Sequence, residues 1–249
     1  MLIVGLAMPD LAFEHPRLAA VYDAFDSDRS DLDVYLAIAR ELGVRRVLDL
    51  GCGTGTFAVL LARKGFEVTG LDPAHASIDV ARGKQGAQRV RWIVGDASAL
   101  PPLQVDLVTM TGNVAQAITD PQAWEAALRT AYESLRPNGH LVFETRDPDF
   151  RGWQEWTPAR THQVANIENV GEVEKWTELI NVALPLVSFR STFLFRASRD
   201  VLASDSTLRF RQRMEVEEQL RAAGYVLDDV RDAPDRPGRE FVFFARRSH

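Results

Sequence analysis

The sequence predicts an α/β protein built on a mostly parallel sheet, because short apolar strands alternate with amphipathic helices as far as residue 145. The strands are apolar almost throughout, as is typical of strands covered on both faces. The first helix is expected at 29–42, with Ser27 or Ser30 as its cap and Gly43 at its end. The elements expected next are strands at 46–50, 66–71, 90–94, 105–110 and 140–145, and helices at 54–64, 74–82 and 121–135.

A different pattern begins after the fifth expected strand. Strand-like stretches then follow one another without intervening helices, at 161–166, 172–181 and 187–195. We therefore expect a small antiparallel sheet, inserted as residues 151–212. A helix at 214–223 and strands at 225–230 and 240–245 complete the chain. Residues 1–249 are thus expected to form a single domain that carries one inserted subdomain.

The balance of charges argues against nucleic acid as a partner. The net charge is −6 and the isoelectric point is about 5.4, whereas a protein that binds a duplex usually presents a basic stripe to the phosphates. The nearest such pattern is Arg209, Arg211 and Arg213. Because these arginines alternate with other residues, we interpret them as the solvent-facing side of one strand.

Cysteine content and apolar segments bear on the compartment. The single cysteine, Cys52, rules out an intramolecular disulfide and a cysteine-rich metal site, so no metal is expected. The apolar residues 2–8 are too few to cross a bilayer, and no basic stretch precedes them. The chain is therefore expected to be cytoplasmic and free of membrane association.

The strongest motif is a glycine-rich loop between the first strand and the next helix. The stretch Val47–Gly55 reads Val-Leu-Asp-Leu-Gly-Cys-Gly-Thr-Gly, and its glycines allow a sharp turn and close approach of a ligand to the main chain. Asp72 follows the second strand, where dinucleotide-binding folds bind ribose hydroxyls with an acid. Asp49, inside the motif, would repel a pyrophosphate but would suit a ligand that carries an ammonium and a sulfonium.

These residues resemble the motifs of class I S-adenosylmethionine-dependent methyltransferases. Val47–Gly55 resembles the first motif of that family, and Asp72 resembles its second-strand acid. Three later stretches resemble further family motifs in order and spacing: Gly95-Asp96-Ala97-Ser98, Asp106–Met110 and Leu135–Val142. The resemblance implies a Rossmann-like sheet of seven strands, mostly parallel, whose last strand, at 240–245, is antiparallel. It also implies that the insertion after the fifth strand forms a lid and a wall for the acceptor.

The resemblance further implies S-adenosylmethionine as the cofactor and S-adenosylhomocysteine as its product. Asp49 would hold the amino group of the cofactor, and Asp72 would bind its ribose hydroxyls. Tyr22 would lie over the cofactor or the acceptor, although a packed aromatic side chain explains its position equally well. The cofactor residues implied in this way are Tyr22, Asp49, Gly51, Cys52, Gly53, Gly55, Asp72, Pro73, Asp96, Ala97, Thr111 and Gly112.

The expected reaction is methyl transfer to an N or O atom, or to a C atom, of a small molecule that the sequence does not identify. Asn113, Glu144 and Arg146 follow strands at the edge where ligands bind. Glu144 is the first choice for a proton acceptor, with His162 as a competitor. Several aromatic residues of the insertion would either line the acceptor site or form the core of the insertion: Trp153, Trp156, Trp176 and Phe193.

Two other functions stay open at this point. One is an NAD(P)-dependent reductase on a similar fold, but its short-chain members carry Tyr-x-x-x-Lys, and no tyrosine of this sequence has lysine at that spacing. The other is a non-catalytic module that binds S-adenosylmethionine without transferring the methyl group. The pattern of residues does not separate such a module from an enzyme, and it does not predict an oligomeric state.

Overall fold

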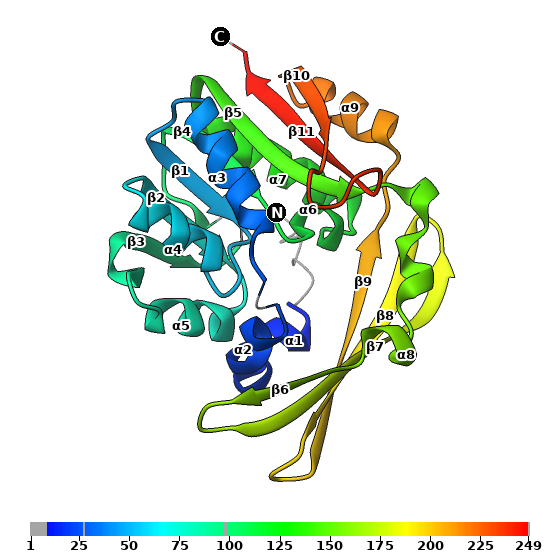
Figure 1. The fold of residues 1–249 in the computed structure, drawn as a ribbon. Coiled ribbons are helices and arrows are strands. Elements are labelled where there is room, and N and C mark those ends of the chain that lie inside the picture. The colour runs from blue at the N-terminus through cyan, green and yellow to red at the C-terminus, as the bar shows by residue number, and fades with distance from the viewer. Residues whose placement is uncertain (1–8, 27, 97–98, 249) are drawn as a thin grey trace, which may run out of the picture.

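The computed structural model describes residues 9–26, 28–96 and 99–248. It contains two sheets that lie side by side (Figure 1). The larger sheet has seven strands in the order β10-β11-β5-β4-β1-β2-β3, and the smaller has four in the order β6-β7-β8-β9. The mostly parallel larger sheet and the separate antiparallel sheet confirm the predicted fold class.

Five parallel strands make up most of the larger sheet. The central strand β1 (Arg46–Leu50) pairs with β2 (Glu67–Asp72) on one side and with β4 (Val105–Met110) on the other. Strands β3 (Val90–Val94) and β5 (Leu135–Arg146) extend the sheet outward from these. Because the five strands run in one direction, their carboxyl ends share one edge, where ligands bind in such folds.

Helices cover both faces of this sheet. They are α3 (Asp31–Glu41), α4 (Thr56–Arg63), α5 (His75–Gly83), α6 (Val114–Ala117), α7 (Pro121–Ser134) and α9 (Arg213–Ala222). Consecutive strand residues point to opposite faces, so Val47 shares a buried cluster with α3 and α4 while Leu48 shares one with α7 and α9. Helix α7 begins at Pro121, and the Asp120 carboxylate caps it by accepting from the amide of Ala123 at 2.8 Å.

The end of the chain closes the sheet with an antiparallel strand. Strands β10 (Tyr225–Asp232) and β11 (Glu240–Arg247) pair antiparallel, and β11 lies between β10 and β5. Phe243 of β11 is opposite Phe143 of β5, and their rings stack with centroids 5.2 Å apart. The antiparallel direction of the last strand is therefore confirmed.

Short helices near the N-terminus join the two sheets, and the sequence pattern did not reveal them because they span too few residues for a helical period. They are α1 (Leu11–Glu14), α2 (Pro16–Tyr22) and the 3-10 helix η1 (Asp23–Phe25). The amide of Ala12 donates to the hydroxyl of Ser204 in the smaller sheet at 2.8 Å, and Leu18 is buried with Phe193. Of the two serines expected to cap α3, Ser30 precedes it without a capping side-chain bond, and Ser27 lies outside the described residues.

The inserted sheet has one strand more than expected. After the short helix α8 (Pro158–Thr161) come β6 (Gln163–Ile167), β7 (Gly171–Ala183), β8 (Leu186–Phe195) and β9 (Asp200–Arg209). Strand β9 was missed because its buried side carries Ser204 and Ser206 beside Leu208, so no apolar alternation marks it. Trp153, Val187 and Phe210 form a buried cluster within the insertion, near the point where β9 leaves it.

The structure corrects the interpretation of the three arginines. Strand β9 ends at Arg209 and α9 begins at Arg213, so the three do not share a strand face. Arg211 is 1% exposed, and its two terminal nitrogens donate to the carbonyls of Ala115 and Ile118, both at 2.7 Å. The last carbonyls of a helix lack partners inside it, so this buried guanidinium completes the short helix α6.

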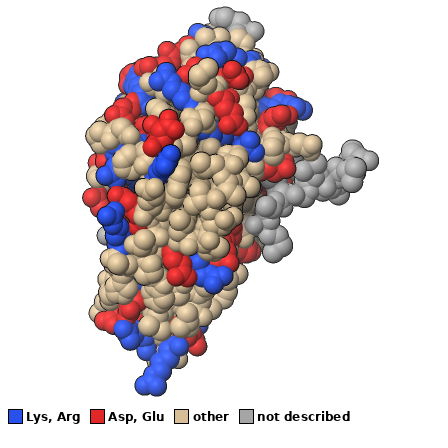
Figure 2. All heavy atoms as spheres, turned by 90° about the vertical axis from the view of Figure 1, so that its right-hand side faces the viewer, with Lys and Arg blue, Asp and Glu red and all other residues tan. Residues whose placement is uncertain are grey.

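Uncharged side chains fill the middle of the face that Figure 2 shows, which is the right-hand side of Figure 1. Exposed apolar residues also mark the hairpin between β7 and β8, where Ile180, Val182 and Leu184 are 50%, 42% and 59% exposed. Within residues 9–26, 28–96 and 99–248, no helix is both long enough and apolar enough to cross a membrane.

Candidate functional site

The glycine-rich loop bends around the carboxyl end of β2. The amides of Gly51 and Cys52 donate to the carbonyl of Leu71 at 2.8 and 3.0 Å, which turns the chain from β1 toward α4. Gly51, Gly53 and Gly55 have φ angles of 74°, 53° and 75°, in the left-handed region that favours glycine. Burial raises the pKa of the Cys52 thiol, so the thiol stays protonated and packs in the loop.

The three glycines of the loop have different surroundings. A Cβ on Gly51 would lie 2.5 Å from the side chain of Val114, and one on Gly55 would lie 2.4 Å from the ring of Trp92. A Cβ on Gly53 would have nothing within 4 Å. Gly51 and Gly55 are thus required by protein packing, whereas Gly53 presents bare main chain to open space.

This difference predicts that one alanine substitution mainly lowers stability and the other mainly weakens ligand binding. Gly55→Ala should lower the free energy of unfolding by at least about 2 kcal/mol, because the left-handed backbone and the clash with Trp92 both oppose a methyl group. Gly53→Ala should lose only about 1 kcal/mol, but it should weaken binding of S-adenosylhomocysteine at least tenfold. Urea unfolding and calorimetric titration of both variants measure the two effects. Equal losses of stability and of affinity in the two variants would contradict the assignment.

Asp49 sits at the centre of the site with an unsatisfied carboxylate oxygen. Its side chain is 1% exposed, and the hydroxyl of Thr109 donates to Oδ1 at 3.0 Å. Oδ2 is sealed from solvent and has no hydrogen-bond partner in the part of the chain that the structure describes. Burial raises the pKa of Asp49 to about 7; the charge of Asp72 raises it further, and that of Arg29 lowers it. Among the described residues no cation forms an ion pair with this carboxylate, so its burial is costly.

Asp72 is held rigidly at the end of β2. Its Oδ2 accepts from the amide of Gly53 at 2.7 Å, and its Oδ1 accepts from the amide of Ala74 at 2.8 Å. Burial raises the pKa of Asp72, and the two backbone donors lower it in part. Each oxygen keeps a further lone pair. Asp72 therefore ties the glycine-rich loop to β2 and can still accept two hydrogen bonds from a ligand.

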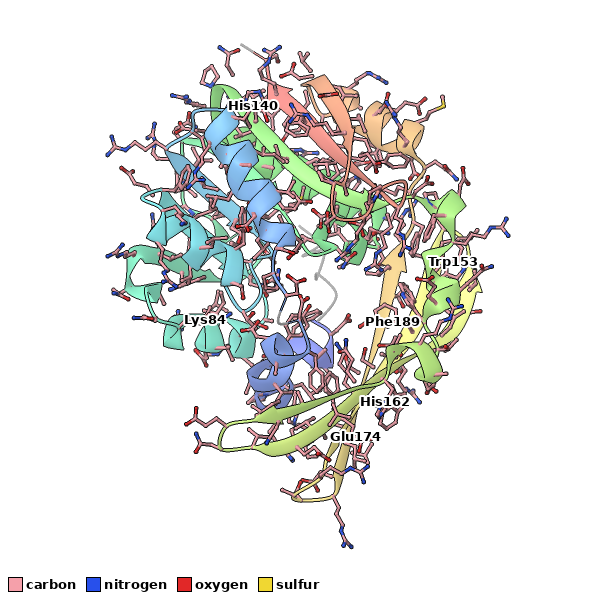
Figure 3. The ribbon with its side chains drawn as sticks, in the orientation of Figure 1. Lys84, His140, Trp153, His162, Glu174 and Phe189 are labelled. Carbon is pink, nitrogen blue, oxygen red and sulfur yellow. The ribbon has the colours of Figure 1, made fainter. Side chains whose placement is uncertain are left out.

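A cluster that the sequence analysis missed fixes Tyr22 next to this loop. Asp23, the residue after Tyr22, accepts from the hydroxyl of Thr54 at 2.6 Å, and its other oxygen lies 2.6 Å from Nζ of Lys84. Lys84 also donates to the hydroxyl of Thr56 at 2.6 Å, and Figure 3 shows it beside α5. Burial raises the pKa of Tyr22 to about 12, so its phenol is neutral. The sequence could not predict the contact between Lys84 and Asp23, because Lys84 follows α5 outside any recognised motif.

Glu144 organises the turn that follows β4. Its Oε2 accepts from the hydroxyl of Tyr35 at 2.7 Å, and its Oε1 accepts from the amide of Asn113 at 3.1 Å. Gly112 and Asn113 both have positive φ, at 73° and 71°, so the turn needs such an anchor. A Cβ on Gly112 would also meet nothing within 4 Å. Bare main chain with open space beside it thus follows β4 as well as β1.

Several solved structures have a fold similar to that of this chain. An S-adenosylmethionine-dependent methyltransferase of Clostridium acetobutylicum is 18% identical, with a TM-score of 0.73 over 94% of this chain and 98% of that chain. CalS10, an amino pentose methyltransferase of Micromonospora echinaspora solved with S-adenosylmethionine bound, is 22% identical, with a TM-score of 0.66 over 92% and 95%. At these identities the likeness is one of fold.

Sequence comparison finds a known domain in part of the chain. Residues 47–139 match the family described as "Methyltransferase domain". Residues 47–139 therefore carry a methyltransferase domain, and the whole chain is similar in fold to S-adenosylmethionine-dependent methyltransferases. The malonyl-[acyl-carrier protein] O-methyltransferase of Serratia marcescens is 33% identical to it over 138 residues, which are 51% of this chain and 52% of that protein. The chain spans about half the length of this curated relative.

Arg146 lies at the carboxyl end of β5, beside the insertion. Its Nε is 3.4 Å from a carboxylate oxygen of Glu240, and its guanidinium lies 5.4 Å from the ring of Trp156. The amide of Arg146 donates to Oε1 of the buried Gln116 at 3.1 Å. The charge of Arg146 also acts on Tyr22 of α2, so these two predicted residues interact although they belong to different elements.

The other predicted residues fall into three groups. Thr111 is half-buried after β4, Asp96 is half-buried after β3, and Pro73 is exposed after β2. Ala97, which the sequence places against the adenine, lies outside the described residues. Among the residues that are described, no cluster of three or more His, Cys, Asp or Glu could hold a metal ion.

The aromatic residues of the insertion separate onto two sides of its sheet. Trp153 and Phe193 are buried, and Trp156 packs against Phe189 with ring centroids 4.6 Å apart. Trp176 instead stacks on His162, whose Nε2 lies 3.0 Å from Glu174. Lys175 contacts Tyr22, and neighbouring strand residues point to opposite faces. Trp176 and His162 therefore lie on the side of the inserted sheet that faces away from Tyr22, whereas Phe189 and Phe193 lie on the side of Lys175. His140 lies at the opposite end of the molecule from His162 (Figure 3).

Proposed function

We propose that this protein is a methyltransferase that transfers a methyl group from S-adenosylmethionine to an N or O atom, or to a C atom, of a small molecule. The observation that carries the proposal is the buried Oδ2 of Asp49, which has no hydrogen-bond partner in the described part of the chain. A buried carboxylate is costly unless a donor or a cation meets it. The ammonium of S-adenosylmethionine would be that partner.

The residues around Asp49 fit the rest of this ligand. The open space beside Gly53 and Gly112 leaves room at the ends of β1 and β4. The Asp72 carboxylate can accept from the two ribose hydroxyls with the lone pairs that its backbone donors leave free. Arg29, whose positive charge acts on Asp49, would meet the ligand carboxylate. Asp96 and Ala97 keep their predicted role beside the adenine.

Positioning is the main contribution of the protein to the reaction. S-adenosylmethionine supplies a methyl group on a positively charged sulfur, where a nucleophile can displace it. Holding the acceptor atom in line with that methyl contributes roughly 7–11 kcal/mol when the geometry is good. The neutral phenol of Tyr22 can hydrogen-bond the acceptor, and Asn113 stands on the turn that Glu144 anchors. Both oxygens of Glu144 already accept hydrogen bonds, which favours a positioning role over removal of a proton.

The insertion is the proposed wall and lid of the acceptor site. In this view residues 1–249 are one domain, and 151–212 form a subdomain that covers the carboxyl edge of the larger sheet. Contacts between α1 and α2 and the inserted sheet support this placement, as does the approach of Trp156 to Arg146. The names of two similar proteins, a malonyl-[acyl-carrier protein] O-methyltransferase and an amino pentose methyltransferase, support an O or an N atom as the acceptor.

Asp72→Asn should weaken binding of S-adenosylhomocysteine at least tenfold, because one of the two acceptors for the ribose hydroxyls becomes an amide donor. Calorimetric titration measures the affinity, and transfer of a labelled methyl group to a metabolite library measures activity in the same preparations. The exposed Asp79, on α5, provides the control Asp79→Asn, which should bind like the wild type. Unchanged affinity of the Asp72 variant would count against the ribose assignment.

The same assay separates the alternatives. A non-catalytic module would bind S-adenosylhomocysteine and transfer no methyl group to any member of the library. An NAD(P)-dependent reductase would bind a nicotinamide dinucleotide instead; the methyltransferase family match and the buried Asp49 in the loop both oppose that function.

A further inference from the structure

Lys175 occupies an unusual position on the side of the inserted sheet that faces α2. It lies on β7 opposite Phe193 of β8. Its Nζ is 5.9, 5.6 and 5.7 Å from the ring centroids of Tyr22, Phe25 and Phe193, respectively. Three aromatic rings from two separate parts of the chain thus surround one ammonium group. Such contacts attract a cation only weakly, by about 0.5–2 kcal/mol.

The ammonium of Lys175 has no anionic partner in the described structure. Across residues 9–26, 28–96 and 99–248, no carboxylate forms an ion pair with it and no side chain forms a hydrogen bond with it. The acid that influences it, Asp26, is already 3.2 Å from the guanidinium of Arg29. Burial lowers the pKa of Lys175. A half-buried cation without a partner is unfavourable unless an anion binds there.

The position of Lys175 suits contact with the methyl acceptor better than contact with the cofactor. Tyr22, which it contacts, is fixed beside the glycine-rich loop through Asp23 and Thr54. The amino and carboxylate groups of S-adenosylmethionine share one carbon atom, so the carboxylate must lie near Asp49. The charge of Arg29 acts on Asp49, so we assign Arg29, which also pairs with Asp26 and Asp31, to that carboxylate. Lys175 is thus available for a second anion.

The same face of the sheet continues with hydroxyl and then aromatic groups. Two residues beyond Lys175, Thr177 lies opposite Ser191, and their hydroxyl oxygens are 3.3 Å apart. Two residues further along β8 from Ser191 is Phe189, which packs against Trp156. The order along this face is therefore a cation, two hydroxyls and an apolar pair, which matches a ligand with an anionic group at one end and an apolar body.

We propose that Lys175 is a specificity residue that binds an anionic group, a carboxylate or a phosphate, on the methyl acceptor, while Thr177, Ser191 and Phe189 contact the acceptor beyond that group. This inference rests on the proposed function, because it assumes that the region between the two sheets holds the acceptor. It narrows the acceptor to small molecules that carry a negative charge at one end of an apolar body.

Calorimetric titrations with three matched probes test this inference. Benzoate and phenyl phosphate carry the two possible anions, and benzamide is their neutral counterpart. Each probe is titrated into the protein with and without saturating S-adenosylhomocysteine. The wild type should bind one or both anions at least tenfold more tightly than benzamide, and the anion preferred tells carboxylate from phosphate. Lys175→Met should abolish this preference, whereas Lys175→Arg should retain most of it.

Affinity for S-adenosylhomocysteine is measured in the same variants. It should change less than twofold in Lys175→Met if the lysine serves the acceptor. Three results would overturn the inference: equal binding of all three probes to the wild type, an anion preference that survives in Lys175→Met, or loss of S-adenosylhomocysteine binding in that variant. A wild type that binds the anions but not S-adenosylhomocysteine would overturn the proposed function and leave the assignment of Lys175 as an anion site intact.

Discussion

As the pH is raised toward 7, the affinity for S-adenosylhomocysteine should increase by up to tenfold per pH unit, and above pH 7 it should level off. The reason is that Asp49 must be ionised to pair with the ammonium of the ligand, and burial raises the pKa of this carboxyl to about 7 in the free protein. Binding of the ammonium lowers that pKa again. Binding at pH 6 should therefore release a proton, which calorimetry in buffers of different ionisation enthalpy detects.

The stability of the free protein should change with pH in the direction opposite to that of ligand affinity, because it also depends on Asp49. The pKa of Asp49 is raised from 3.8 in the unfolded chain to about 7 in the folded one. Between these two values the folded state holds a proton that the unfolded state releases. The stability that Asp49 contributes is therefore present at low pH and is lost as the pH rises toward about 7. Urea unfolding from pH 4 to pH 8, compared with Asp49→Asn, isolates this contribution.

Asp49→Asn separates the charge from the shape of the side chain. The variant should bind S-adenosylhomocysteine about a hundredfold more weakly at pH 8, since a hydrogen bond to a charged partner contributes up to about 3 kcal/mol. Its affinity should also be independent of pH between 5.5 and 8, and its free form should be at least as stable as the wild type at pH 8. A pH profile that keeps the wild-type slope would assign the dependence to another group and remove the support for an ammonium at Asp49.

Arg211→Met should lower the free energy of unfolding by about 3 kcal/mol, which is a fall in melting temperature of roughly 6–12 °C for a chain of this size. The guanidinium donates to the carbonyls of Ala115 and Ile118 and lies 4.6 Å from the ring of Trp124. Methionine fills part of the volume but leaves both buried carbonyls without a donor. Differential scanning calorimetry measures the change.

The same variant should also impair the site, because α6 carries Gln116, and the turn before α6 includes Gly112 and Asn113. Binding of S-adenosylhomocysteine should weaken severalfold in the folded Arg211→Met protein. Arg213→Met is the matched control, because Arg213 begins α9 with a half-exposed side chain paired to Glu217. Its unfolding free energy should change by less than about 0.5 kcal/mol. Equal losses in the two variants would show that the burial of Arg211 is not what stabilises the chain.

Features that depend on hydrophobic periodicity or on the spacing of motif residues were predictable from the sequence. The alternation of apolar strands and helices led to the parallel sheet, and the spacing of Val47–Gly55 and Asp72 led to the loop and its acid. These features are local: a strand, a turn and a helix each depend on neighbouring residues. Elements without such a pattern were missed, namely the short helices α1, α2 and α6 and the strand β9, whose buried side carries serines.

Contacts between distant residues could not be predicted in this way. The sequence placed Asp49 in a motif, but its burial and the free oxygen arise from the packing of β4 against β1. The burial of Arg211, the link from Asp23 to Thr54 and Lys84, and the aromatic surroundings of Lys175 each join segments far apart in the chain. Local patterning therefore specified the chain as a methyltransferase fold with its cofactor motif. The charges and partners in the site depend on desolvation and distance, which exist only once those segments have packed together.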